Sequence, residues 1–204
     1  MKRLSRILRI LWILPFLIVF WQCAPRPSVS TYLGSQAREY FQALQKHWKL
    51  PTPLDWSGQF NATFGPWGNV SGHFQLKSVQ DSLEVTLQGP WGQRVMRWPL
   101  EDTFQALPTA RALILYWLLG TGKTDSLTIQ TLRIRDSVFV FEGLYQGEQI
   151  QLKMDSAGRP RQIQMQGERL EIRAYNGQQP TQIHYAIGGG VLDLVIQETK
   201  NRKP

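Results

Sequence analysis

The chain has 204 residues, of which 23 are basic, 15 are acidic and only one, Cys23, is a cysteine. A single cysteine excludes an intramolecular disulfide, so the folded part must be held together by packing. Four of the basic residues and none of the acidic ones precede Cys23, which leaves 19 basic against 15 acidic residues, a net charge of +4, for the rest of the chain. Apart from a basic tail at 199–204 these charges are scattered, which excludes the concentrated basic face of a nucleic-acid-binding protein.

The first 22 residues have the pattern of a secretory signal. An apolar run over 10–21 follows four basic residues and is too short to span a membrane, which takes roughly 20 apolar residues. Cys23 comes directly after this segment, where bacterial lipoproteins are cleaved and acylated, although Gln22 is unusual before such a cysteine. We therefore predict a lipid anchor at Cys23, with an uncleaved N-terminal anchor or plain secretion as the alternatives.

Residues 23–34 are expected to form the anchor and a tether, because prolines and small polar residues follow Cys23. The remaining length suits one domain, predicted over 35–198. Its first element is a helix over 35–49 that ends before the prolines at 51–53. Its apolar residues recur at helical spacing and are Ala37, Tyr40, Phe41, Leu44 and Trp48.

From residue 56 the period of the apolar residues changes to two, which predicts antiparallel strands with one buried face. The first four strands are expected at 56–64, 70–77, 82–88 and 93–99. A helix at 110–119 follows, apolar on most of its circumference and therefore buried. Further strands are expected at 127–134, 138–144, 149–154, 162–166, 169–175, 181–187 and 191–197. A change of parity between Ile129 and Leu132 predicts a bulge.

These elements predict a mainly β fold with helices. The strands should form one curved antiparallel sheet, an incomplete barrel that the α-helices close over a hydrophobic interior. Patterns for catalysis or metal binding are nearly absent, because the three histidines, His47, His73 and His184, lack metal-ligand spacing. A GTGKT segment at 120–124 resembles a phosphate-binding loop, but Trp117 stands where that motif requires glycine. We expect neither an enzyme nor a bound metal or cofactor.

A four-residue motif occurs twice, 24 residues apart, as Gly65-Pro66-Trp67-Gly68 and Gly89-Pro90-Trp91-Gly92. Each copy lies in a predicted hairpin turn. Both turns should lie on the same rim of the sheet, because they follow the first and third strands of a meander. An exposed tryptophan suits the membrane interface, where an apolar ring with one N–H donor is stable. The alternative is that each indole folds back over its own hairpin.

Four ordered segments resemble the LolA/LolB family of lipoprotein-handling proteins, and within it the outer-membrane receptors of the LolB type. They are Val70-Ser71-Gly72-His73-Phe74, Leu87-Gln88-Gly89-Pro90-Trp91-Gly92, Tyr116-Trp117-Leu118-Leu119-Gly120 and Pro180-Thr181-Gln182-Ile183. Their order and spacing cover most of residues 35–198. The resemblance implies an incomplete antiparallel barrel, closed by helices, whose cavity takes the acyl chains of a lipoprotein.

By this resemblance the protein is a receptor, anchored in the outer membrane and facing the periplasm. It accepts acylated lipoproteins from a LolA-type periplasmic carrier and inserts them into that membrane, and we expect it to act as a monomer. Trp91, beside Pro90, matches the family's protruding loop with an exposed apolar residue, although tryptophan is larger than the aliphatic residue expected there. Trp67 is the second candidate for membrane contact.

Candidate residues for the acyl cavity are Leu83, Val85, Leu87, Leu115, Leu118, Ile129 and Val140. Each could equally be an ordinary core residue, because the sequence does not distinguish a filled core from a cavity. Two alternatives to the receptor therefore stay open. One is a lipid-anchored, non-catalytic structural or accessory protein of the envelope with the same fold and no cargo, and the other is a carrier of a different lipid or glycolipid.

Overall fold

The computed structural model describes residues 29–50, 53–64, 68–79, 82–90, 92–99 and 111–199. Cys23, Trp67 and Trp91 lie outside these residues, as do the expected signal and residues 200–204 of the basic tail. The elements of the described chain are β1 (Ser30–Leu33), α2 (Ser35–Gln45), β2 (Asp55–Phe64), β3 (Asn69–Val79), β4 (Ser82–Gly89), β5 (Gly92–Pro99), α3 (Arg111–Thr121), β6 (Leu127–Arg135), β7 (Val138–Tyr145), β8 (Glu148–Met154), β9 (Pro160–Met165), β10 (Glu168–Asn176), β11 (Gln179–Ile187) and β12 (Gly190–Thr199).

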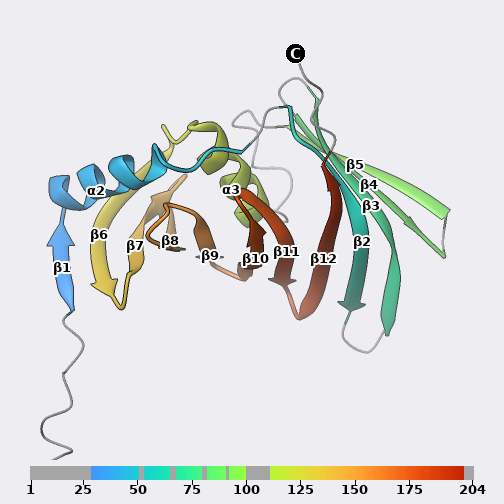
Figure 1. Ribbon diagram of the computed structural model, residues 1–204. Helices are drawn as coiled ribbons and strands as arrows, with labels where there is room; N and C mark the ends of the chain where they lie inside the picture. Colours follow the sequence, from blue (N-terminus) through green and yellow to red (C-terminus); the bar gives the residue numbers. More distant parts are fainter. Residues whose placement is uncertain are drawn as a thin grey trace, which may run out of the picture.

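All these strands belong to one antiparallel sheet, in the order β1-β6-β7-β8-β9-β10-β11-β12-β2-β3-β4-β5. β1 and β5 are its two edges, so the sheet is not closed. It is twisted and bent into an arch, as Figure 1 shows. α2 packs against β1 and β6, and α3 packs against β9 and β10. The predicted mainly β fold, with one curved and incomplete antiparallel barrel, is confirmed by this arrangement.

Alternation of side chains explains which face of the sheet carries the core, because successive residues of a strand point to opposite faces. On β4, Leu83 and Val85 are buried, whereas Glu84 and Thr86 are half-buried. Val85 is the register partner of Leu76 on β3, which is also buried. The apolar period of two seen in the sequence therefore marks the face that packs against the core.

The predicted bulge in β6 is present. Ile129 and Leu132 are both buried although they are three positions apart, and the register with β7 shifts between Ile129 and Thr131. The facing residue is Gly143, where a Cβ atom would lie 2.1 Å from the carbonyl oxygen of Thr128. Glycine is therefore required where the bulged strand approaches β7.

Both predicted helices are present, but α2 ends earlier than predicted. It stops at Gln45 instead of residue 49, and the following segment turns inward so that Trp48 and Leu50 are buried. The Nε1 of Trp48 donates to the carbonyl oxygen of Gln178 (3.1 Å). The backbone N–H of Leu50 donates to the carbonyl oxygen of Gly120 (3.0 Å). These tertiary hydrogen bonds take the place of further helical ones, and the spacing of apolar residues alone could not predict them.

α3 is a buried helix, as its apolar circumference predicted. Eight of its eleven residues are buried, which is possible because the helix lies on the concave side of the arch rather than on the surface (Figure 1). Within the described residues no helix is long and apolar enough to cross a membrane.

The last part of the expected tether forms a strand. β1 pairs with β6 from Ser30, opposite Ile134, to Leu33, opposite Thr131. The ring of Tyr32 stacks against that of Tyr40 on α2, with 4.7 Å between centroids. The sheet therefore begins at β1 rather than after residue 34. A strand of four residues without apolar alternation gives no periodic signal, so the sequence could not predict it.

Candidate functional site

Residues of α3 and of one face of the sheet belong to a single apolar cluster, the buried core cluster. Within it lies a small void in the packing, the cavity, that has no room for a water molecule. The residues that line this cavity are Leu50, Leu54, Trp56, Leu76, Leu83, Leu113, Tyr116 and Trp117. In this conformation the described interior is close to a filled core, with the cavity between α3 and the strands β2, β3 and β4.

Six of the seven candidate cavity residues lie in or against this interior. The buried ones are Leu83, Val85, Leu115 and Ile129. Two more pack half-buried against the cluster, Leu87 and Leu118. Leu83 is the member of this group that lines the cavity itself. The structure thus brings six candidates together around one interior, most of them as packing residues.

Val140 is placed on the opposite face of the sheet. Its register partners are Arg133 on β6 and Lys153 on β8, and it is not part of the core cluster. The adjacent Phe141 is fully buried and occupies the inner face. This stretch of β7 reads VFVF and is apolar at both parities, so alternation could not indicate which residues point inward.

Seven of the eight residues that line the cavity were not proposed from the sequence. Trp56 could have been found, because it shares the parity of the buried Phe60 and Ala62 on β2. Tyr116 and Trp117 belong to the apolar helix, where every position looked equally suited to burial. Which of them faces the cavity depends on how α3 is rotated against the sheet.

A cluster of polar groups, the α3 clamp, fixes the N-terminus of α3 to the sheet. It consists of Arg111, the backbone N–H of Ala112, Glu148, Glu168 and Tyr185. The Glu168 carboxylate, 4% exposed, accepts hydrogen bonds from the Ala112 N–H (3.0 Å) and the Tyr185 hydroxyl (2.7 Å), and lies 3.4 Å from Nε of Arg111. Arg111 also pairs with Glu148. A carboxylate at this position also complements the helix dipole.

The two carboxylates of the α3 clamp follow the same turn sequence. Gln146-Gly147-Glu148 connects β7 to β8, and Gln166-Gly167-Glu168 connects β9 to β10, at the same end of the strands. Burial alone would lower the pKa of Arg111, but the hydrogen bond and charge of Glu148, joined by Glu168, outweigh it and raise that pKa. The guanidinium therefore stays charged and bridges two neighbouring hairpins to one helix end.

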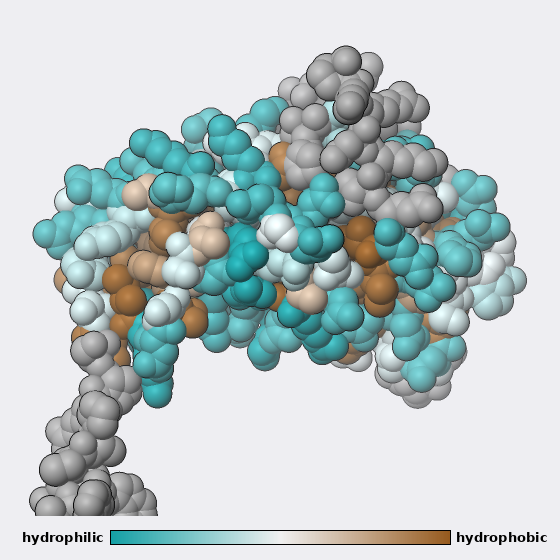
Figure 2. All heavy atoms as spheres, in the orientation of Figure 1, coloured by the Kyte–Doolittle hydropathy of each residue, from teal (hydrophilic) through white to brown (hydrophobic). Residues whose placement is uncertain are grey.

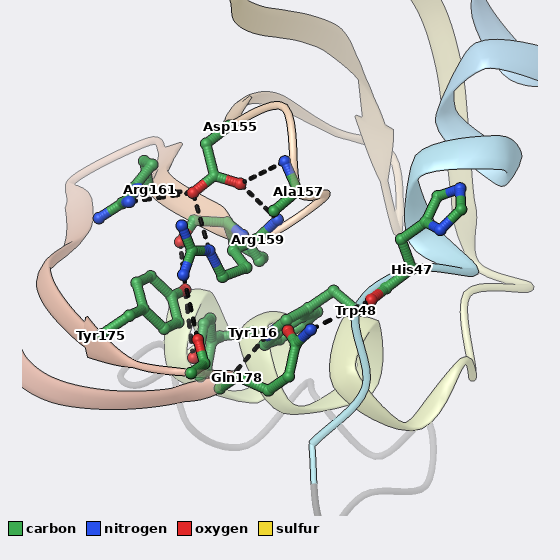
Figure 3. Close-up of polar contacts among 11 residues, drawn as sticks. His47, Trp48, Tyr116, Asp155, Ala157, Arg159, Arg161, Tyr175 and Gln178 are labelled. Atoms are coloured by element: carbon green, nitrogen blue, oxygen red, sulfur yellow. Dashed lines mark hydrogen bonds and ion pairs between the residues drawn. The ribbon is translucent and has the colours of Figure 1, made fainter.

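A second polar cluster lies at the other end of the strands (Figure 3). The Asp155 carboxylate accepts hydrogen bonds from the backbone N–H of Ala157 and Arg159, both at 3.0 Å. It also pairs with the side chains of Arg159 (2.9 Å) and Arg161 (3.0 Å). Both guanidinium groups stack over the Tyr175 ring, at 5.1 and 5.0 Å from its centroid. This cluster therefore ties the β8–β9 turn to β10.

Two tyrosine hydroxyls lie at the inner side of this second cluster, Tyr116 on α3 and Tyr175 on β10, 3.4 Å apart. Burial raises the pKa of Tyr116 well above its ordinary value, and burial likewise raises that of Tyr175. Both hydroxyls are therefore neutral under physiological conditions. Neither offers a nucleophile, and in the described part of the chain no three side chains of the metal-ligating types gather.

β2 and β4 end at the same end of the sheet, because β2, β3, β4 and β5 are consecutive antiparallel neighbours. Pro90 is exposed at the turn that follows β4, and Gly92 adopts a φ of 89° that closes it. The two tryptophans lie outside the described residues.

The face drawn in Figure 2 is mainly polar, with apolar side chains showing through in separate patches. Brown atoms gather at the lower left, where the described chain begins. Val29, directly before β1, is 55% exposed, and Leu33, at the end of β1, is 65% exposed. Both follow the segment that leads from Cys23.

Comparisons with known proteins relate the chain to others through its fold. No protein-family profile and no curated protein matches the sequence. A LolA superfamily protein from Nitrosomonas europaea is similar, with a TM-score of 0.51 and 12% identity over 81% of this chain and 94% of that one. A putative outer membrane lipoprotein-sorting protein domain from Vibrio parahaemolyticus has the same TM-score and identity, over 83% and 93%. At this identity the likeness is one of fold, and the chain has a LolA-like fold.

Proposed function

We propose that this protein binds the acyl chains of lipoproteins in the bacterial envelope and passes them into the outer membrane, as a receptor of the LolB type. The observation that carries the proposal is the apolar helix α3 lying against the concave apolar face of an open sheet. A lipid chain can be housed there only if α3 and the sheet separate, because the cavity between them has no room even for a water molecule. Acyl chains gain roughly 0.8 kcal/mol per buried CH₂, so donor, receptor and membrane must offer comparably apolar sites.

The attachments of α3 suggest how such a movement would occur. The α3 clamp holds its N-terminus, and the hydrogen bond from Leu50 to Gly120 holds its C-terminus. Between these ends the helix makes mainly apolar contacts, besides the 3.4 Å contact of the Tyr116 hydroxyl with that of Tyr175, and apolar contacts are not directional and can be exchanged for contacts with a lipid. We therefore expect loading to separate α3 from β2, β3 and β4 while both ends stay attached.

The arrangement of the edges supports contact with the membrane. Six residues separate Cys23 from Ser30. A fully extended segment of this length spans about 20 Å. An acyl group on Cys23 would therefore hold the exposed Val29 and the start of β1 close to the bilayer. In Figure 1 the start of β1 and the end of β2 point to the same side of the arch. The turn of Trp67 follows that end of β2, and the turn of Trp91 lies at the same end of the strands.

The filled interior also favours a second candidate function, that of a lipid-anchored envelope protein without cargo. Native mass spectrometry of the full chain, extracted in a mild detergent from its own envelope, distinguishes the two. The receptor is expected to carry a non-covalently bound diacyl or triacyl mass, beyond any acyl groups on Cys23 and lost when the protein is denatured. Leu118→Gln should reduce this bound mass by more than tenfold. Val140→Gln, on the outer face, serves as the matched control and should retain it. The mass of the protein with its own anchor alone, unchanged after incubation with a synthetic diacylated lipopeptide, would establish the filled-core protein instead.

The proposed role of Trp91 predicts a separate defect. Trp91→Glu should slow the transfer of a lipoprotein from its carrier into vesicles of outer-membrane lipids at least tenfold, because a charged tip is costly at the hydrocarbon boundary. Binding of the lipopeptide should be unchanged, and Trp91→Phe should retain most of the rate. Transfer at the original rate with glutamate at this position would eliminate the membrane-contacting loop from the mechanism.

A further inference from the structure

Two buried tryptophans at the cavity have hydrogen-bond donors without acceptors. Trp56 on β2 is 1% exposed and Trp117 on α3 is 6% exposed, and both line the same small cavity, which in this conformation has no room for a water molecule. Within the described part of the chain, the Nε1 atom of neither residue has a hydrogen-bond partner. Two unpartnered N–H groups thus come from the two elements that enclose the cavity, one from the sheet and one from the helix.

Such donors are unusual in a folded protein. Roughly 90% or more of buried polar groups are hydrogen-bonded, because desolvation without a partner is unfavourable. The chain satisfies this requirement nearby, where the buried indole of Trp48 donates to the carbonyl oxygen of Gln178 at 3.1 Å. A phenylalanine or leucine at the cavity would provide apolar surface without an unpaired donor. The pair of free N–H groups therefore indicates an acceptor that is supplied from outside the chain.

The rest of the lining restricts what this acceptor can be. The other lining residues are leucines, except for Tyr116, whose hydroxyl faces that of Tyr175. None of the lining side chains is charged, so neither the carboxylate of a free fatty acid nor an ionic headgroup finds a counter-ion. A neutral acceptor that is joined to hydrocarbon fits both the apolar wall and the two N–H groups. The ester carbonyl of an acylated glycerol has this chemistry.

We propose that Trp56 and Trp117 form a carbonyl-recognition site, which binds the ester groups of a diacylglyceryl lipid while its acyl chains occupy the apolar interior. This inference rests on the proposed acyl-binding function and specifies its ligand. The N–H donors compensate the ester oxygens for the water that they lose on entry. An ether-linked chain of the same length lacks these oxygens and leaves both donors unpaired. The site therefore selects acyl esters over hydrocarbon of equal size.

The test compares two synthetic ligands, a dipalmitoylglyceryl-cysteine lipopeptide and its dialkyl-ether analogue. Dissociation constants are measured by native mass spectrometry on the full-length chain released from non-ionic detergent micelles. We expect the ester to bind about tenfold tighter or more than the ether. Trp117→Phe should bring this ratio close to one, and Trp56→Phe should reduce it. Trp48→Phe, which removes a buried indole that already has an acceptor, should leave the ratio unchanged.

The ratio separates recognition from packing, because a loss of packing weakens both ligands alike. Equal binding of ester and ether to the original chain would overturn the carbonyl site and leave acyl binding intact. Binding of neither ligand would instead refute the proposed function itself. If Trp117→Phe does not fold, the proposal is tested instead by NMR, from the indole ¹⁵N–H resonances of the original chain with each ligand. Two of them should shift downfield with the ester and stay in place with the ether, and shifts of equal size with both ligands would contradict the proposal.

Discussion

Replacing Glu168 by glutamine should lower the free energy of unfolding by about 3 kcal/mol. The carboxylate is 4% exposed and receives three donors, from Arg111, the Ala112 backbone and Tyr185. Glutamine keeps the shape, but its NH₂ group must replace one of the two acceptor oxygens. It would then face either the guanidinium or the pair formed by the helix N–H and the tyrosine hydroxyl. One end of the α3 clamp is left with a buried and unsatisfied donor in either orientation.

Urea unfolding followed by tryptophan fluorescence measures this loss. The matched control is Glu148→Gln, at the same position of the repeated Gln-Gly-Glu turn and with the same partner, Arg111. Its side chain is 35% exposed, so water can replace the lost contact and the expected cost is about 1 kcal/mol or less. Equal losses for the two variants would show that the backbone and tyrosine contacts of Glu168 do not hold α3 in place.

Replacing Gly158 by alanine should destabilise the protein by about 3 kcal/mol or more, through a contact with α2. Gly158 lies in the β8–β9 turn with a φ of +76°, and a Cβ atom there would lie 2.2 Å from the carbonyl oxygen of Leu44. A backbone oxygen cannot rotate away as a flexible side chain can. The turn or the end of α2 must therefore move, and this would disturb the neighbouring segment that buries Trp48 and Leu50.

Gly167→Ala is the matched control for this variant. It has the same φ of +76° in the β9–β10 turn, but nothing lies within 4 Å of its Cβ position. It should therefore show only the cost of left-handed backbone, about 1 kcal/mol. The difference between the two free energies of unfolding, measured in urea, isolates the contact with α2. A difference close to zero would mean that the end of α2 yields easily to the added methyl group.

The strands and the two helices could be predicted from local patterns. Alternation on β4 correctly placed Leu83 and Val85 inward, and the parity change at Ile129 correctly indicated the bulge. The prediction for Val140 was wrong because β7 is apolar on both faces, so its own sequence contains no preference. β1 was missed because its four residues show no apolar alternation, and only its pairing with β6 makes them a strand.

The candidate site was predictable in kind but not in detail. An apolar interior with one buried helix follows from composition and period, and six of the seven proposed residues lie in or against it. The positions that give the cavity its chemistry, Trp56 and Trp117, depend on the rotation of α3 against β2. The same applies to Glu168, which in the sequence is one more charged residue after a turn and in the structure is a buried partner of a helix end.

The sequence by itself determined the class of the fold, a mainly β domain with two helices, because side-chain alternation and apolar runs are local properties. Only the tertiary structure decided which side chains meet. The contact of Gly158 with Leu44, the α3 clamp and the two unpaired indole donors join segments distant in the chain. Their geometry depends on how far the sheet twists and where α3 comes to rest on it, and no local pattern contains that information.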